Sequence, residues 1–65
     1  MSSFYIDEET KEEVVVHFRS QTSPLQIAPP LELTIRDDSY RIDISSPPRT
    51  YDIPKDAVLY IEMPI

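Results

Sequence analysis

The stretch Leu31-Glu-Leu-Thr-Ile-Arg-Asp-Asp-Ser-Tyr-Arg-Ile-Asp-Ile-Ser45 carries the clearest structural signal in the chain. Apolar and polar residues alternate on both sides of Asp37-Asp38, and this period of two is typical of strands with one buried face. With the two acids at the turn, the apolar residues of the two halves lie opposite one another on one face. The expected pairs are Ile35 with Tyr40, Leu33 with Ile42, and Leu31 with Ile44. The stretch therefore predicts an antiparallel β-hairpin.

The turn and the polar face of this hairpin leave two questions open. The chain contains no glycine, so a tight primed turn would need Asp37 or Asp38 to adopt left-handed dihedrals, and a looser type I turn is an equal alternative. On the polar face Glu32 lies opposite Asp43, which is unfavourable for two like charges. We expect Arg41, the diagonal neighbour, to relieve the repulsion.

The first 19 residues have two interpretations. An acidic segment separates the short apolar run Phe4 to Ile6 from Val14 to Phe18, whose three consecutive valines favour a strand. Phe4 to Ile6 and Val14 to Arg19 then form a second hairpin. The alternative is a helix over residues 8–19, since acidic residues suit the positive N-terminal end of a helix. We favour the strand.

Proline marks the connections, and the C-terminal segment predicts a closing strand. Gln21 to Pro30 and Ser46 to Pro54 contain six of the seven prolines, so both are expected to connect strands and not to lie in the middle of a sheet. Residues 54–57 suit a short 3₁₀ turn. In the strand that follows, simple alternation places Leu59, Ile61 and Met63 on one face and Val58, Tyr60 and Glu62 on the other.

Together these elements predict a single all-β domain over residues 1–65. About five short strands with proline-rich links suggest a small antiparallel barrel or curved sheet of the SH3-like kind; the helical alternative for residues 8–19 would make the fold α+β. A chain of 65 residues builds only a small core, and this one has no cysteine for disulfides or zinc. We therefore expect a homo-oligomer or a subunit of a complex.

Composition excludes several classes of function. Phosphate-binding loops of the P-loop and dinucleotide type need glycine, and the chain has none. Twelve acidic against six basic residues give a formal charge of -6, which disfavours direct binding to nucleic acid or to an anionic membrane. No apolar run approaches the length of a membrane helix, and the absence of cysteine agrees with a reducing compartment. We expect a cytoplasmic protein without a cofactor or metal.

Catalysis is the least supported class. His17 is the only histidine, and it lies between two apolar residues of a predicted strand with no partner acid evident in the sequence. Serine residues near Pro47 and Pro48 are typical of turns and not of an activated nucleophile. We therefore expect a protein that is not an enzyme.

The favoured function is that of a non-enzymatic protein-interaction module, an accessory or regulatory subunit that docks on a larger protein or self-associates. Tyrosine supplies the amphipathic contact area of many interfaces, and the last strand is largely apolar on both of its faces. The candidate interface residues are Val58, Tyr60, Glu62, Tyr51 and Tyr5.

The alternative is an acidic decoy, a nucleic-acid-mimicking inhibitor of the kind that viruses and mobile elements encode. In this hypothesis carboxylates take the place of phosphates and occupy a basic groove of the partner. The candidate residues are Asp7, Glu8, Glu9, Glu12, Glu13, Asp37 and Asp38. A third possibility, a small ligand held between subunits, is supported by no particular residue.

Overall fold

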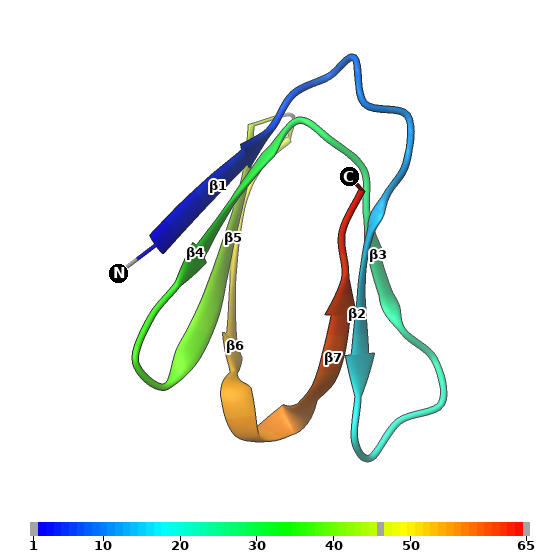
Figure 1. Cartoon of the computed structure of the whole chain (residues 1–65), viewed down its shortest axis with the longest axis vertical. Coiled ribbons are helices and arrows are strands. Elements are labelled where there is room, and N and C mark those ends of the chain that lie inside the picture. The colour runs from blue at the N-terminus through cyan, green and yellow to red at the C-terminus, as the bar shows by residue number, and fades with distance from the viewer. Residues whose placement is uncertain (1, 46, 65) are drawn as a thin grey trace.

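The part of the chain that the structure describes folds into seven β-strands, which form two antiparallel sheets (Figure 1). The computed structural model describes residues 2–45 and 47–64. The first sheet has the order β1 (Ser2–Ile6), β4 (Leu31–Ile35), β5 (Ser39–Ser45) and β6 (Pro48–Pro54). The second has the order β3 (Leu25–Ile27), β2 (Val14–Phe18) and β7 (Val58–Glu62). The all-β class is thus confirmed, but the described residues form seven strands where about five were expected, and the two sheets do not close into a barrel.

The predicted hairpin is confirmed with its register. Strands β4 and β5 pair Ile35 with Tyr40, Leu33 with Ile42, and Leu31 with Ile44. The backbone N–H of Arg36 donates to the carbonyl of Ser39 at 2.9 Å and closes the turn. No non-glycine residue in the described ranges has a positive φ, so the turn is not of the primed kind, which would need left-handed dihedrals.

The predicted N-terminal hairpin is wrong, although both of its strands exist. Strand β1 pairs with β4, whereas β2 pairs with β3 and β7. Residues 7–13 form an exposed acidic connection between the two sheets, where the carboxylates keep their hydration. Pairing with β4 places Ile6 opposite Leu31 and so brings it to the apolar face of the hairpin. The helix proposed for residues 8–19 is also wrong, because this segment holds strand β2 and no α-helix occurs among the described residues.

The proline-rich segments lie at sheet edges, but they are not only connections. Strand β3 lies within the first segment and β6 within the second, each at the end of its sheet. Pro48 and Pro54 are the terminal residues of β6, where an edge strand tolerates the missing N–H. Ser46, which begins the second segment, lies outside the described residues. The 3₁₀ turn is confirmed as η1 (Lys55–Ala57).

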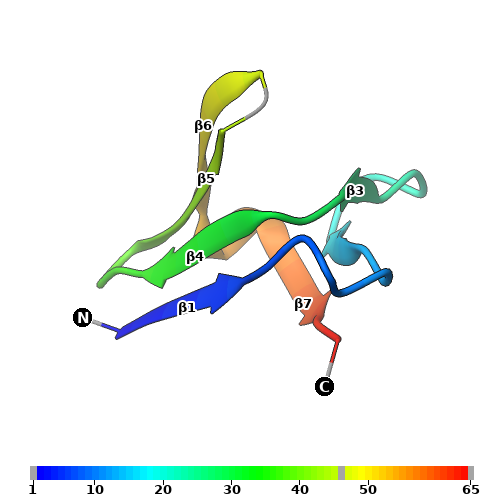
Figure 2. The same cartoon turned by 90° about the horizontal axis from the view of Figure 1, so that it is seen from above.

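The core lies between the two sheets and draws on both. Its buried side chains are Ile6, Val14, Val16, Ile27, Leu31, Leu33, Ile42, Ile53 and Val58. The four-stranded sheet twists strongly from β1 to β6 (Figure 2), and the three-stranded sheet covers only part of its inner face. Side chains at the margins of the core are therefore only half-buried.

The predicted facing of the last strand is wrong at Val58. Val58 is only 5% exposed and belongs to the core, whereas Leu59 is 55% exposed. The cause is an irregularity in the β2–β7 ladder: Phe18 pairs with Val58 but His17 pairs with Tyr60, so Leu59 is an extra residue. A β-bulge of this kind reverses the alternation on either side of it. Val58 points inward, and so does Ile61 beyond the bulge.

Candidate interaction surfaces

The outer face of β2 and β7 carries an ordered group of three side chains, His17, Tyr60 and Glu62. The imidazole of His17 stacks on the ring of Tyr60, with centroids 4.2 Å apart and an angle of 19° between the planes. Its Nε2–H donates a hydrogen bond to Oε1 of Glu62, and the two atoms are 2.6 Å apart. The β2–β7 pairing makes both contacts, because it places His17 opposite Tyr60 and diagonal to Glu62.

This group, which we call the Tyr60 patch, corrects one interpretation of the sequence. His17 does have a partner acid, and that acid is Glu62, 45 positions further along the chain. No local pattern identifies the pair, since only the pairing of β2 with β7 brings the two residues together. The arrangement fixes the orientation of the imidazole and of the Tyr60 ring on an exposed surface. Aromatic rings held in this way are suited to contact a binding partner.

The structure does not combine the five candidate interface residues into one surface. Tyr60 is 50% exposed and Tyr5 is 69% exposed, but they lie on the outer faces of different sheets. Tyr51 is half-buried and packs against the core, opposite Ile42. Val58 is a core residue, so it offers no surface contact. Of the predicted set, only Tyr60 and Glu62 are neighbours at an exposed site.

The acidic candidates divide between opposite ends of the four-stranded sheet. Asp7 to Glu13 follow the end of β1, where Ile6 pairs with Leu31, whereas Asp37 and Asp38 follow Ile35, at the other end of the same ladder. All seven candidate acids are exposed. In the connection after β1, Asp7 Oδ1 accepts a hydrogen bond from the N–H of Glu9 at 3.1 Å.

The second acidic group has a cation close by. The N–H of Lys55 donates to the carbonyl of Asp38 at 2.9 Å, and the Nζ atom of Lys55 lies 5.5 Å from the centre of the Tyr40 ring. This cation–π contact holds a positive charge near the turn. The decoy hypothesis therefore depends mainly on residues 7–13, where five acids accompany a single cation, Lys11.

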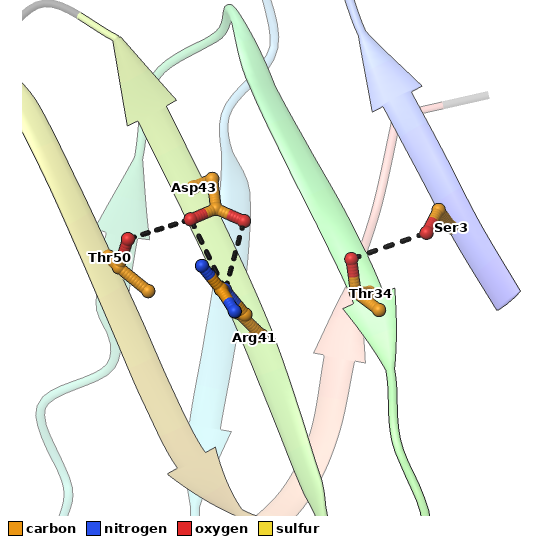
Figure 3. A network of polar contacts seen from close by, with 5 residues as sticks. All are labelled: Ser3, Thr34, Arg41, Asp43 and Thr50. Carbon is orange, nitrogen blue, oxygen red and sulfur yellow. Dashed lines mark hydrogen bonds and ion pairs between the residues drawn. The ribbon is translucent and has the colours of Figure 1, made fainter. Parts of the chain in front are cut away.

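The outer face of the four-stranded sheet carries a polar network around Asp43 (Figure 3). The hydroxyl of Thr50 donates to Oδ1 of Asp43 at 2.7 Å, and Nε of Arg41 lies 3.3 Å from Oδ2. The hydrogen bond from Thr50 is the main cause that lowers the pKa of Asp43 below its usual value; the charge of Arg41 acts in the same direction, and burial opposes both. As expected, Glu32 lies opposite Asp43 and Arg41 contacts one member of this like-charged pair.

A shallow hollow of about 420 Å³ lies beside this network. Its lining residues come from β1, β4, β5 and the turn after β4: Ser3, Glu32, Thr34, Arg36, Arg41 and Asp43. The hydroxyls of Ser3 and Thr34 are 3.3 Å apart across the β1–β4 ladder. Charges of both signs alternate here, so the surface has no strong preference for a cationic or an anionic ligand.

Metal ligands are not grouped among the residues that the structure describes, since no three of His, Cys, Asp and Glu converge there. Within the same residues, no helix has both the length and the apolar character needed to cross a bilayer. Comparison of the chain with protein-family models, with curated proteins and with solved structures finds no match. The functional argument therefore depends on the surface geometry.

Proposed function

We propose that this protein is a non-enzymatic interaction module, an accessory or regulatory subunit that docks on a larger protein through the Tyr60 patch. The observation that supports the proposal most directly is the pre-ordered ring of Tyr60, which is half exposed while it stacks on His17. An exposed aromatic side chain that is already held in place loses little rotamer freedom when a partner covers it.

The neighbouring residues extend this surface. Leu59 is exposed because of the bulge, so an exposed aliphatic residue directly precedes the aromatic one in the chain. Glu62 adds a charge at the same face, which suits the polar rim that surrounds the apolar centre of many interfaces. An apolar centre with one flanking acid predicts a partner that presents an apolar pocket beside a basic or hydrogen-bond-donating group.

The other expectations from the sequence stay predictions. They are an SH3-like arrangement of the strands, a cytoplasmic location, self-association, and function without a cofactor. Docking through the Tyr60 patch does not depend on the SH3-like arrangement, because the patch needs only the β2–β7 pairing.

Capture of partners from the native host tests the proposal. The tagged protein, Tyr60→Ala and the matched control Tyr5→Ala are used as baits, and each is washed at low and then at high salt. We expect one larger protein to stay bound to the parent and to Tyr5→Ala through high salt. Loss of an interface tyrosine commonly costs about 2 kcal/mol, or about thirtyfold in affinity, so Tyr60→Ala should release it. Equal retention by both variants would refute docking through this patch.

The acidic decoy is the second candidate, and the exposed acids of residues 7–13 favour it. In this case the retained protein binds nucleic acid and is lost at high salt, because exposed charge pairs are screened. Replacing Glu8, Glu9, Glu12 and Glu13 by glutamine should then abolish capture, whereas Tyr60→Ala should not. Retention of the partner by the glutamine variant would exclude the decoy.

A further inference from the structure

Strand β1 is an edge strand without the features that normally keep edges from pairing. Proteins protect sheet edges with charges, prolines, bulges or very short strands. Strand β3 has three residues and follows Pro24, β6 has proline at both ends, and β7 carries the bulge and Glu62. Strand β1 has five residues, Ser-Ser-Phe-Tyr-Ile, with neither charge nor proline. It pairs with β4 in a regular register.

Phe4 shows that the inner face of this edge is incompletely covered. It lies opposite Leu33 on the face that bears Ile6, and both of those residues are buried. Phe4 itself is 46% exposed, because the second sheet stops short of β1. In Figure 2, β1 lies at the rim of the molecule with no strand on its far side. The edge thus combines free backbone hydrogen-bonding groups with an uncovered aromatic side chain.

The small core without disulfides or zinc makes self-association the expected source of stability, and the charge of the chain indicates where two copies can meet. Two molecules that each carry a formal charge of -6 repel one another over most of their surfaces. A five-residue strand without a charged side chain is a place where two copies can meet without opposing like charges. A homodimer also uses the same patch twice, as two-fold interfaces do.

We propose that two copies join through β1, which pairs antiparallel with the β1 of the other copy about a two-fold axis at Phe4. This inference deepens the self-association part of the proposed function and rests on it. Full overlap of a five-residue strand with itself puts the central residue on the axis. Phe4 then meets the second copy's Phe4, while Ser2 lies opposite Ile6 and Ser3 opposite Tyr5. The two four-stranded sheets become one continuous sheet.

A contact limited to one five-residue strand on each copy is expected to bury less than the roughly 800 Å² that each partner buries in a standard interface. We therefore expect a dimer that dissociates on dilution.

Disulfide trapping tests both the contact and its register, because the chain has no cysteine of its own. In Phe4→Cys the two cysteines lie directly opposite each other. The distance between their Cα atoms then falls within the about 4.4–6.8 Å that a disulfide allows. In the matched control Ser2→Cys they are about 13 Å apart along the strand. Mild oxidation should give a covalent dimer with Phe4→Cys and none with Ser2→Cys. Equal yields would indicate random collision and would overturn the proposal.

Sedimentation equilibrium of the unmodified chain and of two lysine variants gives an independent measurement. From about 1 μM to about 1 mM, a range that suits a small interface, the parent should move from one to two chain masses. Phe4→Lys should stay monomeric with an unchanged circular dichroism spectrum, whereas Leu59→Lys, on the exposed bulge of β7, should dimerise like the parent. A parent that stays monomeric, or a dimer lost only in Leu59→Lys, would overturn the β1 contact. Partner capture by Phe4→Lys then reports on the Tyr60 patch separately.

Discussion

Truncation of Val58 and of Leu59 provides the sharpest test of the bulge in β7. Simple alternation places Leu59 inward with Ile61 and Met63, whereas the structure buries Val58 and exposes Leu59. The two residues are adjacent and both are aliphatic, so their alanine variants differ mainly in burial. We expect Val58→Ala to destabilise the protein strongly and Leu59→Ala to have little effect.

The magnitude follows from the exposure of each side chain. Val58 is 5% exposed, so alanine removes both γ-methyl groups from the core, at about 0.8 kcal/mol for each buried carbon. The cavity that remains adds to this loss, and we expect about 2 kcal/mol in total. For a small domain this lowers Tm by about 8–16 °C. Leu59→Ala removes more carbon atoms, but from an exposed site, and should cost no more than about 0.5 kcal/mol.

Urea denaturation followed by far-ultraviolet circular dichroism measures both changes. A domain of this size has a free energy of unfolding of about 3–5 kcal/mol, so a loss of about 2 kcal/mol moves the midpoint clearly while leaving a folded baseline. Dilute samples keep the measurement independent of self-association. A loss at Leu59 equal to or larger than the loss at Val58 would refute the bulge and restore simple alternation.

Three further predictions test other parts of the structure. Thr50→Val should raise the pKa of Asp43, measured by carboxyl ¹³C titration. Because folding lowers this pKa from its usual 3.8, the stability it contributes is present above that pH and lost as the pH falls through the folded value; the variant should lose less stability on acidification. Tyr60→Ala should move the ring proton resonances of His17 downfield, because the stacked ring that shields them is gone; unchanged resonances would contradict the stack. Ile42→Ala should cost about 2–5 kcal/mol, since Ile42 is fully buried; urea denaturation should then show a much lower midpoint or no folded baseline, and a variant as stable as the parent would contradict its place in the core.

The central hairpin could be predicted from the sequence because its information is local. The alternation around Asp37-Asp38 fixes which residues face the core, and a slip of one position would turn every apolar side chain outward. The register of β4 and β5, the opposition of Glu32 and Asp43, and the short 3₁₀ turn follow from patterns within a few residues. The all-β class follows from the same periodicity and from the valine run of β2.

The pairing between distant strands was decided only in the tertiary structure. Nothing local shows that β1 joins β4 and not β2, because either pairing satisfies the alternation of a strand with one apolar face. The partnership of His17 with Glu62 depends on the β2–β7 ladder, and the inward position of Val58 depends on one extra residue in that ladder. Sequence patterns specify which face of each strand is apolar. Which strands pair with one another depends on burying the apolar faces of both sheets in one small core.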